Sequence, residues 1–360
     1  EQLAALTGEA PTIELDQARR LFAEALETPG GLKIQTIHAF CDSLLRRFPL
    51  EASAPPSFRM LEGREQSALI DRILDEMAGT PAFAAVSDLM NEDAITDLAR
   101  EVVGARDRFP SEVDEAAIAA AFDAAPPFDP AAARVAAIEA LDERALTAMI
   151  AAYGAGAAAE QKKANRLRDG LEKKGAALAG ALIDDFLKKD GQPYSEKSVA
   201  TKSSKDAEPN WQALTNHLID MAVAARTAEL NAVAADRASR LAQFGAALVA
   251  RYEELKTAGG LLDFDDLVGK ARALLTSSEM AQWALYRLDG GVDHILVDEA
   301  QDTSPEQWDV VKAIAEEFHA GLGARDEART LFVVGDEKQS IYSFQGAAPG
   351  EFDRMRRHFD

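Results

Sequence analysis

Two adjacent carboxylates, Asp298 and Glu299, close a short apolar run in the segment HILVDEAQDTSPEQWDVV, residues 294–311. A strand end of this kind can ligate a metal ion and position a water molecule. The simpler interpretation is a strand that stops at a polar loop. Asp298 offers the hard oxygen ligand that Mg²⁺ prefers, and Glu299 could orient or deprotonate an attacking water. The pair alone is weak evidence, so the choice between a metal site and a polar loop depends on the surrounding segments.

A second apolar run, TLFVVGDEKQ at 330–339, also ends in polar residues, which begin at Gly335 and Asp336. The segment between the two runs, SPEQWDVVKAIAEEF, has helical spacing, with a serine cap and a proline in the first turn. Strand, helix and strand in this order predict a βαβ unit with a parallel sheet. Ligands bind beyond the carboxyl ends of such strands, so the two polar clusters should meet at one edge. This favours the metal interpretation and makes Gln339 a candidate sensor of a γ-phosphate.

Three zones follow one another along the chain, at 1–56, 57–257 and 258–360. In the first zone we expect a helix over TIELDQARRLFAEALE, a short strand over LKIQTI (32–37) and a helix over HAFCDSLLRRF. The middle zone is rich in alanine and charge and nearly free of strand signal. Its stretch 210–256 has no proline and one glycine, Gly245, which predicts one or two long helices. The two flanks should therefore form one α/β subdomain, and the middle zone a separate helical lobe.

The net charge of -22 argues against a protein that coats nucleic acid with its whole surface. A local basic groove remains open, because residues 160–208 hold 11 Lys/Arg against 9 Asp/Glu. This segment is either a solvated helix face of mixed charge or a surface that touches phosphates.

A single cysteine, Cys41, excludes an internal disulfide and suggests a cytoplasmic context. The histidines and the cysteine form no ligand-spaced cluster, so we expect no structural zinc. No apolar run has membrane-spanning length, and we expect no membrane partner. The first residue is Glu1 rather than Met, and no signal peptide is visible, so we expect a piece of a longer protein.

Four segments together resemble a known family. ILVDEAQDTSPEQW and VVGDEKQSIYSFQGA resemble motifs II and III of superfamily 1A helicases of the UvrD/Rep type. IQTIHAFCDSLLRRFPLEA resembles the DNA-contacting TxH motif of that family, and LLDFDDLV the segment that leads back into the ATPase core. The details are most similar to the AddA helicase–nuclease subunits. The four segments occur in family order and bracket the helical middle zone.

The resemblance implies an α/β fold, a partial RecA-like (P-loop NTPase) parallel sheet with a large all-helical 1B insertion. Residues 1–56 and 258–360 would be parts of domain 1A, and residues 57–257 the insertion. The implied function is that of an ATP-dependent DNA helicase motor that uses ATP and Mg²⁺. It would translocate on single-stranded DNA and unwind duplex DNA in double-strand break repair and recombination, together with an AddB-like partner.

The resemblance also assigns roles to seven side chains. These are Asp298 for Mg²⁺, Glu299 as catalytic base, Gln339 at the γ-phosphate, Thr36 and His38 on single-stranded DNA, and Tyr342 and Phe344 stacked on bases. Other interpretations stay open. The two aromatic residues could pack in the core as an i, i+2 pair on a strand, and His38 could be a buried histidine at a helix start. Asp263, Asp265 and Asp266 are expected to cap and orient a helix.

Two departures from the family pattern matter. Gln345 stands where the family often has arginine. The phosphate-binding pattern G-x-x-x-x-G-K-[ST] is missing, because the one Gly-Lys pair, Gly269–Lys270, is followed by Ala271. By resemblance that loop would precede Glu1, and the second motor domain would follow Asp360. We therefore expect the 360 residues alone to be inactive. The alternative is a degenerate, non-enzymatic module that binds DNA or a partner protein.

Overall fold

A computed structural model describes residues 34–276, 294–320 and 330–336, with single helical positions at 20, 23, 27, 281, 283, 284, 287 and 354. Gln339, Tyr342, Phe344 and Gln345 lie outside the described residues. The chain divides into two compact units. Unit 1 comprises residues 1–65 and 256–360, and unit 2 comprises residues 66–255.

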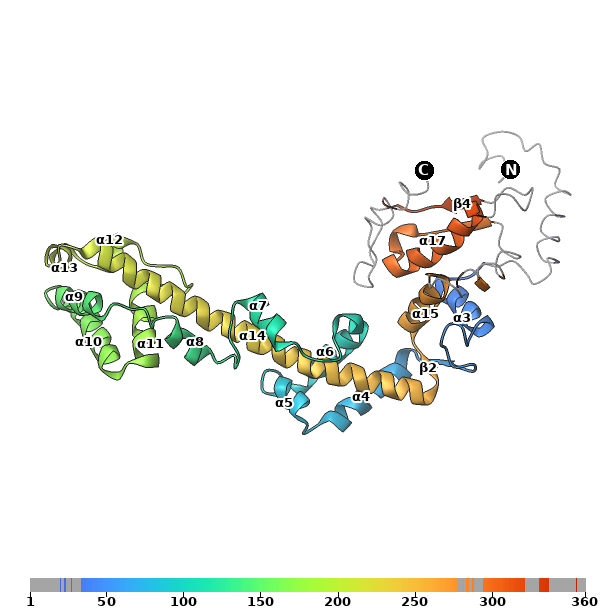
Figure 1. The fold of residues 1–360 in the computed structure, drawn as a ribbon, viewed down its shortest axis with the longest axis horizontal. Helices are drawn as coiled ribbons and strands as arrows, with labels where there is room; N and C mark the ends of the chain where they lie inside the picture. Colours follow the sequence, from blue (N-terminus) through green and yellow to red (C-terminus); the bar gives the residue numbers. More distant parts are fainter. Residues whose placement is uncertain are drawn as a thin grey trace, which may run out of the picture. The chain divides into compact units, whose positions relative to one another are not determined.

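Unit 1 combines helices with two short parallel ladders (Figure 1). Its described elements are α3 (Ile37–Arg47), β1 (Arg59–Met60), β2 (Leu261–Leu262), α15 (Phe264–Thr276), β3 (His294–Val297), the 3-10 turn η2 (Ala300–Asp302), α17 (Pro305–Ala320) and β4 (Thr330–Val333). The core lies where α3 packs on α15, with Leu45 and Leu274 almost fully buried, and the α17 residue Val310 joins it. Burial of these aliphatic side chains is the main term that holds the helices together.

The helix expected over HAFCDSLLRRF is present as α3, but the strand expected over 32–37 is wrong where the structure describes it. Residues 34–36 have no strand pairing, and Ile37 already begins the helix. Thr36 caps α3, because its Oγ1 accepts the backbone N–H of Ala39 at 3.2 Å. In the part of the chain that the structure describes, no strand lies beside residues 34–36, and Ile34 is 87% exposed.

The predicted βαβ unit is confirmed by β3, α17 and β4. The two strands are parallel, with His294 opposite Thr330 and Val297 opposite Val333. Ser304 caps α17 as expected, since its Oγ accepts the N–H of Gln307 at 3.3 Å. One face of the strands packs on Trp308 and neighbouring residues of α17. The opposite face remains open among the described residues, with Leu296 71% exposed.

Unit 2 is built along one helix, α14 (Trp211–Gly259), whose last residues belong to unit 1. The other elements are α4 (Gly63–Met77), α5 (Pro81–Ser87), α6 (Glu92–Gly104), η1 (Arg106–Arg108), α7 (Glu115–Phe122), α8 (Pro130–Ala136), α9 (Glu143–Gly154), α10 (Ala158–Lys173), α11 (Gly175–Phe186), α12 (Glu196–Val199) and α13 (Lys202–Asp206). Figure 1 shows α9, α10 and α11 beside the N-terminal part of α14 and α4 and α5 beside its C-terminal part. The long helix predicted over 210–256 is therefore confirmed.

One short strand falls inside the zone that was expected to be helical. Residues 59–60 form β1, which pairs in parallel with Leu261–Leu262. The prolines of the preceding APPSF segment favour extended backbone at this point, and no helical period begins until Gly63. None of the helices in the described ranges has both the length and the apolarity needed to cross a membrane.

Candidate functional site

The polar clusters that follow β3 and β4 meet at one edge, as predicted. Beyond the paired strands, the N–H of Val334 donates to the carbonyl of Val297 at 2.8 Å. The N–H of Ala300 then donates to the carbonyl of Val334 at 3.0 Å. The two chain segments thus stay hydrogen-bonded past their strand ends, which brings the residues after Val297 next to Gly335 and Asp336.

Asp298 and Glu299 both lie exposed at this edge. One carboxylate oxygen of Asp298, Oδ1, accepts the backbone N–H of Glu299 at 3.0 Å. The backbone of Glu299 is left-handed, with φ 50° and ψ 43°. For a side chain other than glycine, such a conformation costs on the order of 1–3 kcal/mol and persists only where surrounding contacts fix it. The carboxylate pair therefore sits on a turn that its neighbours hold in place.

The side chain of Gln301 makes hydrogen bonds that stabilise this turn. Its side chain is 1% exposed, and both ends of its amide are used. Nε2 donates to Oε2 of Glu299 at 2.6 Å, and Oε1 accepts the backbone N–H of Asp336 at 2.9 Å. Sequence reasoning missed Gln301 as a functional residue, because a glutamine in the polar turn DEAQDTS carries no local sign of burial.

Gly335 is required by the same packing. A Cβ at this position would lie 2.7 Å from Oε1 of Gln301 and 3.1 Å from Cβ of Ala300. Both distances are shorter than ordinary van der Waals contacts. The glycine in VVGDEKQ thus lets the end of β4 approach the turn that carries Glu299.

The donor chemistry of this edge fits Mg²⁺. Among the described residues, no group of three or more His, Cys, Asp or Glu side chains could hold a metal ion without help. Mg²⁺ does not need such a group, because it keeps several waters and binds through one or two carboxylates plus substrate phosphates. The exposed carboxylate of Asp298 suits that mode of binding.

His38 lies where three of the resembling segments converge. Its ring contacts Phe264 of LLDFDDLV edge-on, with ring centroids 5.0 Å apart, and its Nε2 lies 3.5 Å from Nε2 of Gln307, which belongs to the helix after β3. Burial lowers the pKa of His38, and the charge of Asp265 partly opposes that shift. Thr36, by contrast, is exposed, and its hydroxyl is engaged in capping α3.

Two of the three acidic residues of LLDFDDLV, Asp263 and Asp266, cap α15 as predicted. Asp263 and Asp266 each accept the other's backbone N–H at 3.0 Å. The ammonium group of Lys256, 2% exposed, lies 3.2 Å from Asp263 and 2.7 Å from Asp266. The three charged groups are held together by these ion pairs, and this cluster fixes the start of α15. We therefore assign it a structural role.

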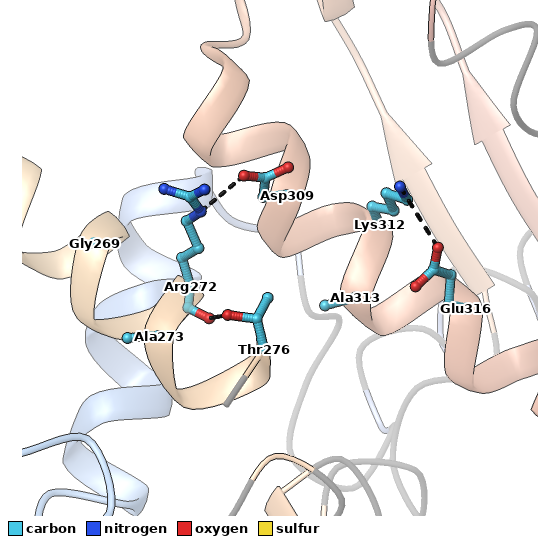
Figure 2. A pocket seen from close by; sticks show the side chains of 8 residues that line it. All are labelled: Gly269, Arg272, Ala273, Thr276, Asp309, Lys312, Ala313 and Glu316. Carbon is cyan, nitrogen blue, oxygen red and sulfur yellow. Dashed lines mark hydrogen bonds and ion pairs between the residues drawn. The ribbon is translucent and has the colours of Figure 1, made fainter. Parts of the chain in front are cut away.

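A cavity of about 450 Å³ lies between α15 and α17, and none of the predicted site residues lines it (Figure 2). Its cations are already paired, Arg272 with Asp309 at 2.7 Å and Lys312 with Glu316 at 3.7 Å. Gly269, from the single Gly-Lys pair, lines it from within α15. That pair is therefore helical and forms no phosphate-binding loop. We consider the strand ends, and not this cavity, as the candidate site.

The chain belongs to the family of the UvrD/REP helicase N-terminal domain, whose family model matches residues 16–360. It is similar to an ATP-dependent helicase/nuclease subunit of Bacillus pumilus, with 26% identity over 368 residues, and to its counterpart in Bacillus licheniformis, with 25% identity over 390 residues. Both alignments cover 91% of this chain. The ATP-dependent DNA helicase UvrD1 of Mycobacterium tuberculosis is 34% identical over 121 residues, which are 33% of this chain and 15% of that protein. The resemblance to UvrD/Rep helicases, and to the AddA helicase–nuclease subunits in particular, is thereby confirmed.

These relatives are much longer than the present chain. The alignments span 29% of the Bacillus pumilus protein and 30% of the Bacillus licheniformis protein.

Proposed function

We propose that this chain is the ATPase-core and insertion part of an ATP-dependent DNA helicase that unwinds duplex DNA in double-strand break repair and recombination. The observation that carries this proposal is the meeting of two polar strand ends, with Asp298 and Glu299 exposed at their shared edge. Membership of the UvrD/REP family and the names of the relatives support it.

In this proposal, Glu299 is the base for ATP hydrolysis. A water oxygen attacks the γ-phosphorus, the bond from that phosphorus to the β–γ bridging oxygen breaks, and ADP leaves with the electron pair. The proton of the water passes to the carboxylate of Glu299. Asp298 would hold Mg²⁺, which neutralises charge on the phosphates when bound. Gln339, by family resemblance, would contact the γ-phosphate.

Single-stranded DNA would cross unit 1 near Thr36 and His38, with Tyr342 and Phe344 stacked on bases. Base–aromatic stacking is worth roughly 1–3 kcal/mol per base and tolerates any sequence, as a translocating motor requires. Because the hydroxyl of Thr36 caps α3, its DNA contact would have to use the exposed side of the same hydroxyl or the backbone.

We further propose that residues 1–56 and 258–360 form part of a RecA-like domain 1A and that residues 57–257 form the 1B insertion. The parallel β3–β4 pair and the helical composition of unit 2 support this assignment. An AddB-like protein would be the partner of the whole protein, since the relatives named as helicase/nuclease subunits imply that each works with another polypeptide.

The test is the Glu299→Gln variant of the whole protein that carries this chain. Single-stranded DNA-stimulated ATP hydrolysis should fall by about 10²–10⁴-fold, because the amide keeps the shape of the side chain and removes the base. Binding of a fluorescent ATP analogue with Mg²⁺ should persist. Normal turnover by the variant would remove Glu299 from the mechanism. An unsubstituted whole protein without any ATPase activity would instead favour the degenerate binding module.

A further inference from the structure

We propose that Gln301 is a positioning residue that fixes the Glu299 carboxylate to the end of β4, so that the neighbouring strand sets the geometry of the base. This inference rests on the proposed function, because it assumes that Glu299 is the base. It concerns a buried side chain that lies within the segment ILVDEAQDTSPEQW but was given no role there.

The first support is the hydrogen bonding of the amide. A glutamine offers two donors and two acceptors, and a buried one is costly unless these are used. Gln301 places its donor end on Glu299 Oε2 at 2.6 Å and its acceptor end on the N–H of Asp336 at 2.9 Å. One rigid planar group thus spans from the carboxylate to the backbone of the adjacent strand end.

The second support is the close packing around this bridge. Gly335 leaves no room for a Cβ against Oε1 of Gln301, and the N–H of Ala300 is bonded to the carbonyl of Val334 at 3.0 Å. Glu299 itself stands in a left-handed backbone conformation, which neighbouring contacts must maintain. These contacts all come from the residues that follow β4, so a shift of that segment would move the carboxylate.

The third support is chemical. A general base works only when its oxygen is held within hydrogen-bond reach of the proton that it accepts. Glu299 is exposed, and an exposed carboxylate on a flexible side chain would sample many orientations. The Gln301 amide restrains one of its oxygens and leaves the other available for water.

The experiment compares three substitutions in the whole protein. Gln301→Ala removes the bridge, Gln301→Asn keeps the amide but is one methylene too short to reach both partners, and Gln301→Glu keeps the length but replaces the donor with a carboxyl. For Ala and Asn we expect kcat for DNA-stimulated ATP hydrolysis to fall about tenfold or more, with KM for ATP nearly unchanged.

Gln301→Glu separates positioning from mere folding. The new carboxyl would lie against Glu299, and two carboxyl groups at such a distance share a proton. The acid limb of the kcat profile should therefore move to higher pH by about one unit or more, with activity partly restored in alkaline buffer. A residue that only fills space would not move this limb.

The matched control is Gln66→Ala. Gln66 also donates from Nε2, to the hydroxyl of Tyr252 at 3.0 Å, but it belongs to unit 2, whereas the strand ends belong to unit 1. It should leave both kcat and the pH profile unchanged. Normal kcat in Gln301→Ala, or losses in all three variants that follow their melting temperatures with no shift of the acid limb, would overturn the proposal. The Glu299→Gln variant, measured beside them, shows separately whether the proposed function holds.

Discussion

His38 illustrates how burial sets the charge of a candidate site residue. Packing against Phe264 removes water from the imidazole, and this desolvation lowers the pKa of His38 below 6.5. Burial therefore favours the neutral form of the side chain. A neutral imidazole can donate one hydrogen bond to a DNA phosphate or base but adds no ionic attraction.

We expect the His38 ring to titrate below pH 6.5 in a proton NMR titration of the 360-residue chain, with its resonance identified by its loss in His38→Gln. Asp265→Asn should lower the midpoint further, because the charge of Asp265 favours the protonated ring. Since the unfolded chain binds this proton more readily, the contribution of His38 to stability should be complete above pH 6.5 and fall on acidification below it. A midpoint at or above 6.5 would contradict the burial argument.

The candidate site could be predicted from the sequence wherever a motif carries its own chemistry. Asp298 and Glu299 follow an apolar run, and the return of a second run after one helix suffices to place Gly335 beside them. The role of Gln301 in the packing could not be predicted, because a glutamine after a strand is usually exposed. Its burial depends on the register of β3 against β4, a long-range pairing that no local pattern encodes.

At the scale of elements, Gly245 shows that a helix interior can require glycine for packing. It lies within α14, where alanine would ordinarily be favoured by up to about 1 kcal/mol. A Cβ at this position would lie 2.2 Å from Cδ1 of Phe109, so the ring of the segment after α6 occupies the space above the glycine.

Gly245→Ala should therefore destabilise unit 2 by about 1–3 kcal/mol, as overpacked substitutions commonly do. Gly180→Ala is the matched control, since a Cβ added to Gly180 inside α11 would meet no atom within 4 Å, and it should stabilise by up to about 1 kcal/mol. Urea unfolding of the chain measures both changes. In a Phe109→Ala background, Gly245→Ala should lose its penalty, and a penalty that persists there would exclude Phe109 as the cause.

The contact between α10 and α11 buries a carboxylate. Asp185 is 1% exposed, its Oδ1 lies 3.2 Å from Arg166, and its Oδ2 is buried without a hydrogen-bond partner among the described residues. Burial raises the pKa of Asp185 to about 6, against the opposing charges of Arg166 and Lys163. The folded state thus favours the protonated acid.

The sign of the effect on stability follows from proton binding. Between pH 4 and pH 6 the folded chain holds this proton more tightly than the unfolded chain, so stability falls as pH rises through about 6. Asp185→Asn, which is uncharged at every pH, should be more stable than the original chain by about 1–3 kcal/mol at pH 8 and gain little at pH 4. Urea unfolding at the two pH values measures this difference in stability.

The exposed neighbour provides the control, since Asp184→Asn should change stability by less than about 1 kcal/mol. An equal gain at both pH values for Asp185→Asn would rule out titration as its source.

At the scale of the whole molecule, the 360 residues contain the acidic pair but no sequence of the type G-x-x-x-x-G-K-[ST]. Such a loop cradles the phosphates with backbone N–H groups and a lysine, and an acidic pair cannot replace it. Arginines from a second motor domain can add a further factor of about 10³–10⁵ in rate.

We therefore expect almost no ATP hydrolysis by the 360-residue chain with Mg²⁺ and single-stranded DNA, and robust DNA-stimulated hydrolysis by the whole protein. A phosphate-release assay on the 360-residue chain and on the whole protein measures the two rates. The Glu299→Gln variant of the whole protein gives the background rate. Rapid turnover by the chain alone would mean that its phosphate site lies elsewhere than at the ends of β3 and β4.

The helical zone could be predicted in outline because period and proline breaks are local signals. The boundaries of this zone were harder to predict from the sequence. The strand β1 is two residues long and is defined only by its pairing with Leu261–Leu262, about 200 residues later in the chain. The expected strand is wrong at residues 34–36 because, among the described residues, no strand pairs with them, and an alternating pattern forms a strand only when it has a partner.

The long helix α14 takes part in two separate packing groups. Near its start, Trp211 and Leu218 belong to the cluster formed with α9, α10 and α11, whereas Tyr252, near its end, is buried and accepts a hydrogen bond from Gln66 of α4. Phe244 and Leu248 are also buried near this end, but between Leu218 and Phe244 the buried apolar positions are alanines, such as Ala232 and Ala235, which bury little apolar area. The two ends of such a helix can unfold separately, because cooperative unfolding depends on side-chain packing more than on the continuous backbone hydrogen bonds of the helix. The two ends of α14 should then exchange their amide hydrogens with different free energies of opening, each shared with the helices that pack against that end.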